Sequence, residues 1–181
     1  MSSKILVEFG NQKFSFLTEP GVFSPNQLDL GSRVLLENLP EGKNVLDLGC
    51  GYGAMGIIYA KLHPERFVTL LDNNLRAFEL TKKNVLLNEV RNVKPFKADV
   101  TYSTLPWEFD LIFSNPPWAK SKSVLPKLFQ FANNHLAVGG RFYVVVNKTF
   151  PTEDALREIF GKVVVVVEQS PYKVLQSIRT S

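Results

Sequence analysis

Cysteine and histidine are scarce in this chain of 181 residues, which contains one cysteine, Cys50, and two histidines, His63 and His135. A single cysteine cannot form an intrachain disulfide. With only two imidazoles beside it, the chain lacks a convincing cluster of zinc ligands. We therefore expect neither disulfide stabilisation nor a bound metal ion.

Long hydrophobic runs are also missing. No stretch approaches the roughly 20 apolar residues that a membrane helix needs. The first residues lead straight into the run that starts at Ile5, without the apolar region and cleavage site of a signal peptide. The net charge of +4 is compatible with a nucleic-acid partner but is weak evidence for one. We expect a soluble, cytoplasmic protein with no membrane partner.

The organisation of the chain predicts one domain over residues 1–181, since the length fits one domain and we find no internal repeat or long linker. Two short runs of alternating apolar residues, 4–9 and 13–18, flank Gly10-Asn11-Gln12 and indicate a β-hairpin. We expect residues 1–25 to form this hairpin and an entry segment, and residues 26–181 to form the catalytic core.

Helical and strand patterns alternate after the hairpin. Strands are expected at residues 44–48, 67–72, 93–97, 109–114 and 141–147, the last after a turn at Gly139-Gly140. Helices are expected at residues 27–39 with Asn26 as the cap, 54–63, 75–87, 124–136, and from a cap at Thr152 through Ile159. A strongly buried strand at 163–167 and a strand at 172–178 are separated by a short turn, so this pair must be antiparallel. The pattern predicts an α/β, Rossmann-like, doubly wound and mostly parallel sheet with an antiparallel C-terminal strand.

A glycine-rich loop joins the first predicted strand of the core to the following helix. Glycines let a backbone turn tightly and approach a ligand, and free N–H groups at a helix start favour polar or anionic groups. The spacing from Gly49 to Ala54 also satisfies the dinucleotide fingerprint, so the loop alone does not choose between cofactors. We interpret the cysteine in it as a small filler beside the cofactor, because no activating base can be identified. The candidate cofactor contacts in this segment are Asp47, Gly49, Cys50, Gly51 and Gly53.

Two acidic residues follow the next two predicted strands. Asp72 ends the strand at 67–72, where a carboxylate can accept hydrogen bonds from both ribose hydroxyls of a nucleoside cofactor. Asp99 could accept a hydrogen bond from an adenine amino group, and a solvated surface acid is the alternative. Their neighbours Asn73 and Val100 complete the predicted contacts on this side.

The motif Asn115-Pro116-Pro117-Trp118 follows the strand at 109–114 and indicates the chemistry. The nitrogen of an exocyclic amine or an amide is a poor nucleophile because its lone pair is delocalised. The Asn115 side-chain carbonyl and the Pro116 main-chain carbonyl could each accept one N–H, which fixes the nitrogen in a pyramidal form. The prolines keep the loop rigid, and Trp118 offers a flat face for a base or amide. The motif predicts N-methylation by S-adenosylmethionine, with Asn115 also near this cofactor; a rigid loop plugged by an aromatic is the alternative.

With these motifs the chain resembles the small-domain class I methyltransferases of the ribosomal RNA guanine-N2 type, including the small-subunit methyltransferase C family and its short archaeal relatives. The likeness covers nearly the whole chain. Besides the glycine loop and Asn115-Pro-Pro, it rests on Pro20-Gly-Val-Phe-Ser24, Leu28-Asp-Leu-Gly-Ser32 and Tyr172-Lys-Val-Leu175.

The resemblance implies a seven-stranded sheet, bound S-adenosylmethionine, and methylation of a guanine exocyclic amine in ribosomal RNA. We expect the partner to be ribosomal RNA or the small ribosomal subunit, and the protein to be a monomer or small homo-oligomer. The resemblance also implies that Phe23 and Asp29 lie near the methionine end of the cofactor. The chain departs from bacterial relatives in lacking their extra N-terminal domain and in having Trp118-Ala-Lys where they have Phe-His. Basic residues beside the motif could contact RNA phosphates or form a solvated face. They are Lys120, Lys122 and Lys127.

Other functions remain open at this point. Adenine, cytosine or a protein glutamine amide would present the same kind of nitrogen to Asn115. A nicotinamide-dependent oxidoreductase would use the same glycine loop, but the chain leaves little room for a substrate domain and Asn115-Pro-Pro-Trp has no role in hydride transfer. An inactive RNA- or protein-binding module is the third possibility.

Overall fold

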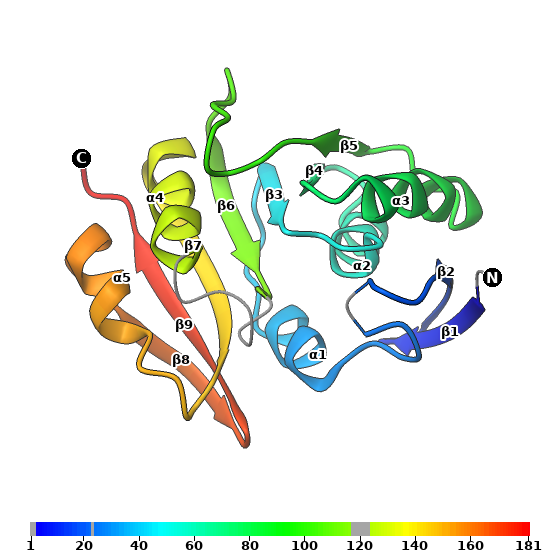
Figure 1. The fold of residues 1–181 in the computed structure, drawn as a ribbon, viewed down its shortest axis with the longest axis horizontal. Helices are drawn as coiled ribbons and strands as arrows, with labels where there is room; N and C mark the ends of the chain where they lie inside the picture. The colour runs from blue at the N-terminus through cyan, green and yellow to red at the C-terminus, as the bar shows by residue number, and fades with distance from the viewer. Residues whose placement is uncertain (1–2, 23, 117–123) are drawn as a thin grey trace.

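The computed structural model describes residues 3–22, 24–116 and 124–181. Within these residues, seven strands form one sheet in the order β5-β4-β3-β6-β7-β9-β8, and β1 and β2 form a separate hairpin (Figure 1). The five strands from β5 to β7 are parallel, and β9 runs antiparallel to both β7 and β8. The strands are β1 (Ser3–Phe9), β2 (Gln12–Thr18), β3 (Asn44–Leu48), β4 (Phe67–Asp72), β5 (Val93–Lys97), β6 (Phe109–Ser114), β7 (Leu136–Asn147), β8 (Val164–Gln169) and β9 (Tyr172–Ile178). The predicted fold class is confirmed.

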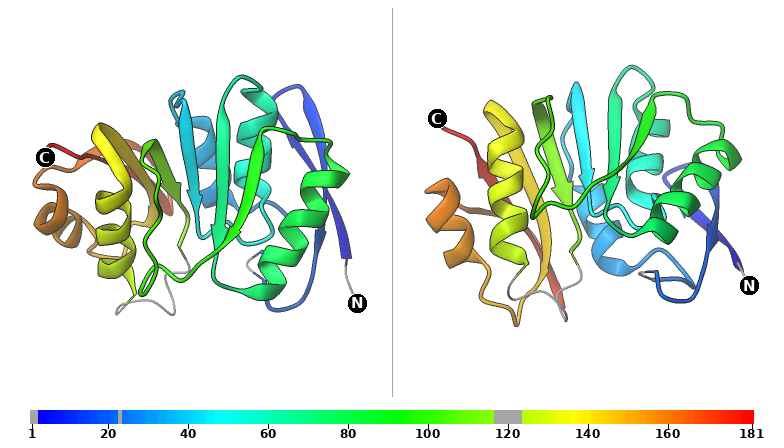
Figure 2. Two further views of the ribbon diagram at one scale, coloured as in Figure 1. Left: turned by 90° about the horizontal axis from the view of Figure 1, so that it is seen from above. Right: turned by 45° about the horizontal axis from the view of Figure 1, so that its top comes forward.

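Helices cover both faces of the sheet, because alternate residues of its central strands point to opposite sides. Val45 of β3 packs with the hairpin and the first three helices, whereas Leu46 packs with the last two. Figure 2 shows the hairpin beside α3, at the far end of the molecule from α5. Among the described residues, no helix is both long and apolar enough to cross a membrane. The helices are α1 (Leu30–Glu37), α2 (Ala54–Leu62), α3 (Leu75–Leu87), α4 (Leu125–His135) and α5 (Glu153–Phe160).

Asn84 of α3 and Asn88, the C-cap of this helix, fix the hairpin to the core. Asn84 is fully buried, and its side chain pairs with both the N–H and the C=O of Leu17 in β2. Asn88, one helical turn later, makes the same pair of contacts with Ser15. Asn84 also donates to the carbonyl of Tyr52 at 2.8 Å, so one side chain joins the hairpin, the helix and the glycine loop.

The first helix begins later than the sequence predicted. Asp29, not Asn26, is its N-cap, and the Asp29 carboxylate accepts a hydrogen bond from the Ser32 N–H at 3.2 Å. Both residues are good capping types, so local preference could not choose between them. Gln27 and Leu28, which were predicted to be helical, therefore lie before the helix. Leu28 lines the cavity described below.

Three other expectations at the C-terminal end were wrong. The strand at 164–169 is the exposed edge of the sheet, not a buried strand, and Val165 is 46% exposed. Strand β7 begins at Leu136, directly after α4, so Gly139 lies inside it, near a register shift opposite β6. Thr152 occupies the N-cap position of α5, but its hydroxyl donates to the Phe150 carbonyl instead of capping the helix.

Candidate functional site

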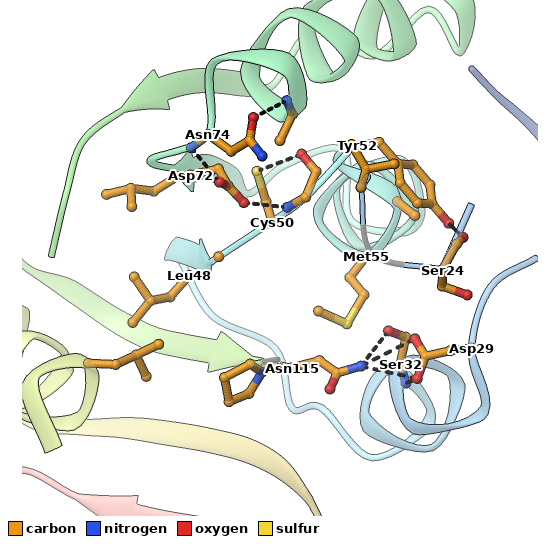
Figure 3. Close-up of a pocket in the computed structure, with 18 of the residues that line it drawn as sticks. Ser24, Asp29, Ser32, Leu48, Cys50, Tyr52, Met55, Asp72, Asn74 and Asn115 are labelled. Carbon is orange, nitrogen blue, oxygen red and sulfur yellow. Dashed lines mark hydrogen bonds between the residues drawn. The ribbon is translucent and has the colours of Figure 1, made fainter. Parts of the chain in front are cut away.

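A cavity of about 890 Å³ lies at the carboxyl ends of the parallel strands, where the sequence placed its motifs. It combines residues from the glycine loop, from the ends of β4 and β6, from the segment after β5 and from the region before α1 (Figure 3). Several of the predicted site residues line it. They are Asp29, Gly49, Cys50, Gly51, Asp72, Asn73, Val100, Asn115 and Pro116.

The glycine loop leaves open space above its backbone. Gly49 and Gly51 have φ values of 77° and 59°, a region that favours glycine, and a Cβ at either residue would meet no atom within 4 Å. The N–H groups of Gly49 and Cys50 both donate to the Leu71 carbonyl, at 2.8 and 2.9 Å, which holds the loop against the end of β4. Such a loop fits a ligand that lies directly on the main chain.

Asp72 joins the glycine loop to the start of α3 through its two carboxylate oxygens. Oδ2 accepts from the Gly51 N–H at 2.8 Å, and Oδ1 accepts from the Asn74 N–H at 2.8 Å. Burial raises the pKa of this carboxyl, and these backbone hydrogen bonds oppose the increase. The sequence predicted only a ribose-binding role for Asp72. In the structure, Asp72 also shapes the loop that would bind the cofactor.

Two residues that were predicted to contact the cofactor, Asp47 and Gly53, do not line the cavity. Asp47 is fully buried, and its Oδ2 accepts from the Gly56 N–H at 2.8 Å. Its Oδ1 has no hydrogen-bond partner among the described residues, and burial raises its pKa to about 8. Gly53 is the N-cap of α2. Asp47 thus joins β3 to the first turn of α2, and Gly53 ends the loop where this helix begins.

Asp99 stays at the edge of the cavity, between the lining residues Ala98 and Val100. Its Oδ1 accepts from the Thr101 N–H at 2.8 Å, and this hydrogen bond is the main cause of its lowered pKa. The positive charge of Lys127, an exposed residue of α4, lowers the same pKa. Asp99 is therefore a charged carboxylate beside the predicted adenine end.

Asn115 faces α1 across the cavity from Asp72, as Figure 3 shows. Its Nδ2 lies 3.2 Å from each carboxylate oxygen of Asp29 and 2.9 Å from the Ser32 hydroxyl. The carboxamide therefore has a defined orientation, with its nitrogen toward α1. The resemblance implied that Asp29 lies near the cofactor; the structure adds a direct contact with the predicted catalytic asparagine.

The remaining predicted site residues lie outside the described part of the chain. They are Phe23, Pro117, Trp118, Lys120 and Lys122.

Three polar residues of the site were given no role in the sequence analysis. Ser32 contacts Asn115, and Asn74 caps α3 while its own N–H binds Asp72. Thr81 donates to the Gly51 carbonyl at 2.9 Å from α3. Helix periodicity brings Thr81 and Asn84 to one face, but nothing in the local sequence shows that this face supports the glycine loop.

Known proteins similar to this chain include methyltransferases and an uncharacterised protein. Residues 13–176 match the methyltransferase small domain. The uncharacterised protein YbxB of Bacillus subtilis is 32% identical over 92% of this chain and 87% of its own length. The ribosomal RNA small subunit methyltransferase C of Serratia proteamaculans is 38% identical over 88% of this chain and 47% of its own length.

A solved structure gives the same picture. The 16S rRNA N2 methyltransferase RsmC of T. thermophilus, in complex with AdoMet and guanosine, matches 98% of this chain and 50% of its own, with 27% identity and a TM-score of 0.89. The chain thus spans about half the length of the ribosomal RNA methyltransferases that it resembles.

Proposed function

Because the chain belongs to the methyltransferase small domain family, we propose that it transfers a methyl group from S-adenosylmethionine to the exocyclic N2 amine of a guanine in ribosomal RNA. The observation that carries this proposal is that the glycine loop and Asn115 line one cavity. Similarity to methyltransferases of 16S rRNA supports the choice of substrate.

The cofactor half of the cavity offers contacts suited to a nucleoside. Gly49 and Gly51 leave room on the main chain, and the Asp72 carboxylate lies beside them, where it can accept ribose hydroxyls. We assign Asp99, which lies between the lining residues Ala98 and Val100, to accept a hydrogen bond from an adenine amino group. S-adenosylmethionine, when bound, supplies a methyl group that its sulfonium centre has already activated.

The other half would hold the target nitrogen. Since Nδ2 of Asn115 is bound by Asp29 and Ser32, we assign its Oδ1 to accept one N–H of the amine. Pro116 also lines the cavity, and its main-chain carbonyl would accept the second N–H. Two acceptors hold the nitrogen and direct its lone pair. Stacking of the base on Trp118 remains a prediction from the sequence.

A base must leave its stack to reach this site. Asn115 is 7% exposed, so a nitrogen that contacts it has to enter the cavity. Enzymes that act on such a base bind single-stranded RNA or extrude the nucleotide. The net charge of +4 and the exposed Lys127 are compatible with phosphate contacts to RNA. Methylation of an unpaired guanine is therefore expected to exceed that of the same guanine in a rigid duplex.

The test is methyl transfer to RNA. The protein is incubated with isotopically labelled S-adenosylmethionine and unmodified small-subunit ribosomal RNA, and the digested nucleosides are analysed by mass spectrometry. We expect labelled N2-methylguanosine. The Asn115→Ala variant should lose at least 100-fold in rate, because its contact with the substrate amine is lost. Its affinity for S-adenosylmethionine should change little.

Three outcomes would change the proposal. Label in adenine, cytosine or a protein glutamine would retain N-methylation and replace the substrate. Binding of NAD in place of S-adenosylmethionine would indicate an oxidoreductase. Absence of transfer to any RNA, with RNA binding intact in wild type and in Asn115→Ala, would indicate an inactive binding module.

A further inference from the structure

The oxygen and the NH₂ group of the Asn115 carboxamide are similar in shape but differ in chemistry. Only its oxygen can accept an N–H from a substrate amine, and rotation by half a turn would present its NH₂ group instead. A wrongly turned amide would oppose the amine donor to donor. The reaction proposed above therefore requires the orientation of Asn115 to be fixed before substrate binds.

The residues that contact its nitrogen have the chemistry to do this. Both Asp29 oxygens lie 3.2 Å from Nδ2. A carboxylate is only an acceptor, so it would repel Oδ1 and attract the NH₂ group. The Ser32 hydroxyl lies 2.9 Å from Nδ2, and Ser32 is itself buried. The N–H of Ser32 donates to Asp29, which fixes the carboxylate at the start of α1.

We propose that Asp29 and Ser32 are positioning residues that hold Asn115 with its carbonyl oxygen toward the substrate nitrogen. This inference rests on the proposed N-methyltransferase function. It differs from the role that the resemblance implied, in which Asp29 is near the cofactor. Hydrogen bonding of the NH₂ group to a carboxylate also draws electron density toward Oδ1, which makes that oxygen a better acceptor.

An exchange of the two side chains tests the proposal. Asp29→Asn keeps a helix cap, because asparagine caps as well as aspartate, but it places an amide where a pure acceptor is required. Asn115→Asp places two carboxylates against each other. In the double variant Asp29→Asn, Asn115→Asp, the amide introduced at position 29 can donate to one oxygen of the carboxylate introduced at position 115 and leave the other oxygen for the substrate.

The expected pattern is a loss in each single variant and a gain in the pair. We expect kcat to fall at least tenfold in Asp29→Asn and at least 100-fold in Asn115→Asp, with the KM for S-adenosylmethionine changing less than threefold. The double variant should be at least tenfold faster than Asn115→Asp alone. Ser32→Ala removes one of the acceptors and should lower kcat about threefold. Asp154→Asn, at an 84% exposed side chain, is the matched control for removal of a carboxylate.

Other results would overturn the assignment. A raised KM for S-adenosylmethionine with unchanged kcat in Asp29→Asn would assign Asp29 to the cofactor. Equal rates in the double variant and in Asn115→Asp would show that the contact does not orient the amide. A fall in thermal stability of Asp29→Asn that accounts for its lost rate would reduce its role to capping α1.

A second measurement does not depend on activity. The side-chain NH₂ signals of Asn115 can be recorded by nitrogen-15 NMR and assigned from their loss in Asn115→Asp. We expect slow hydrogen exchange in the wild type and faster exchange in Asp29→Asn. Identical exchange in both proteins would refute the proposal even if no methyl transfer were found, whereas absence of transfer with the expected exchange would contradict only the proposed function.

Discussion

At the scale of single residues, Asp72 combines two tasks that are usually attributed to separate groups. Its oxygens receive the N–H groups of Gly51 and Asn74, and the same carboxylate is the proposed acceptor for ribose hydroxyls. A residue in this position would both shape the loop and bind the proposed ligand. Its removal should therefore weaken cofactor binding more than the loss of one ordinary hydrogen bond would.

We expect Asp72→Ala to weaken binding of S-adenosylmethionine by tenfold or more. Each hydrogen bond to a charged group contributes about 1.5 to 3 kcal/mol, and a tenfold change corresponds to about 1.4 kcal/mol. Isothermal titration calorimetry measures the affinity, with the exposed Asp154→Ala as control. Unchanged affinity in Asp72→Ala would remove this residue from the cofactor site.

The buried Asp47 predicts a dependence of stability on pH. Burial raises its pKa from 3.8 to about 8. Between these values the folded protein keeps a proton that the unfolded chain has released, so the contribution of Asp47 to the free energy of unfolding falls as the pH rises from about 4 to about 8. Asp47→Asn has no titrating group and should lose this part of the pH dependence.

Urea denaturation of the ligand-free protein at pH 5, 6, 7 and 8 tests this prediction. Wild type should lose stability relative to Asp47→Asn at each step toward pH 8. Other carboxylates contribute to both proteins, so the difference between the two curves isolates Asp47. Parallel curves would show that its carboxyl is not protonated in the folded state.

At the scale of elements, Asn84 of α3 connects parts that are distant in sequence. Asn84→Ala would leave the N–H and C=O of Leu17 and the C=O of Tyr52 without their partner. Unpaired buried polar groups cost about 1 to 3 kcal/mol each, so we expect destabilisation of more than about 2 kcal/mol. Amide hydrogen exchange should become faster in β2.

Asn88→Ala is the comparison for that prediction. Asn88 also pairs with the hairpin, at Ser15, but does not contact the glycine loop. We expect it to cost less stability and to leave the affinity for S-adenosylmethionine unchanged, whereas Asn84→Ala should lower both. If the two variants weakened the binding of S-adenosylmethionine equally, the hydrogen bond from Asn84 to the glycine loop would not matter for cofactor binding.

Elements with strong local patterns were predicted to the residue, and failures occurred where tertiary context decides. The strands from Asn44, Phe67 and Phe109 and the helix from Leu75 were predicted correctly, because their apolar periodicity and flanking turns agree. The valines of β8 indicated burial, but the strand order places them at an open edge. Local sequence does not reveal which strand ends a sheet.

The site was predictable to a similar extent. Motifs at strand ends identified both halves of the cavity, since parallel strands bring their carboxyl ends to one edge. The contact between Asp29 and Asn115 joins residues 86 positions apart. Its two members were each selected, for different reasons, but nothing in either motif pairs them. This contact follows only from tertiary packing, in which α1 lies against β7 and β9 and its N-terminus meets the residue after β6.

At the scale of the whole molecule, the residues proposed to bind the cofactor and the target all lie in a chain about half as long as its ribosomal RNA methyltransferase relatives. The hairpin, the sheet and α1 all contribute to the walls of one cavity or to their support. Folding and cofactor binding should therefore be coupled over the entire chain, as expected for the single domain that the sequence predicts.

We accordingly expect one cooperative unfolding transition that S-adenosylmethionine moves to higher temperature. A ligand present at 100 times its dissociation constant stabilises the folded state by about 2.7 kcal/mol. In a chain of 181 residues this corresponds to a rise in Tm of roughly 5 to 11 °C. Differential scanning calorimetry measures the shift, with NAD as the comparison ligand. NAD should leave the Tm unchanged, because the cavity combines the nucleoside contacts with Asn115 instead of a nicotinamide site. Two separate transitions, of which S-adenosylmethionine moves only one, would contradict the coupling.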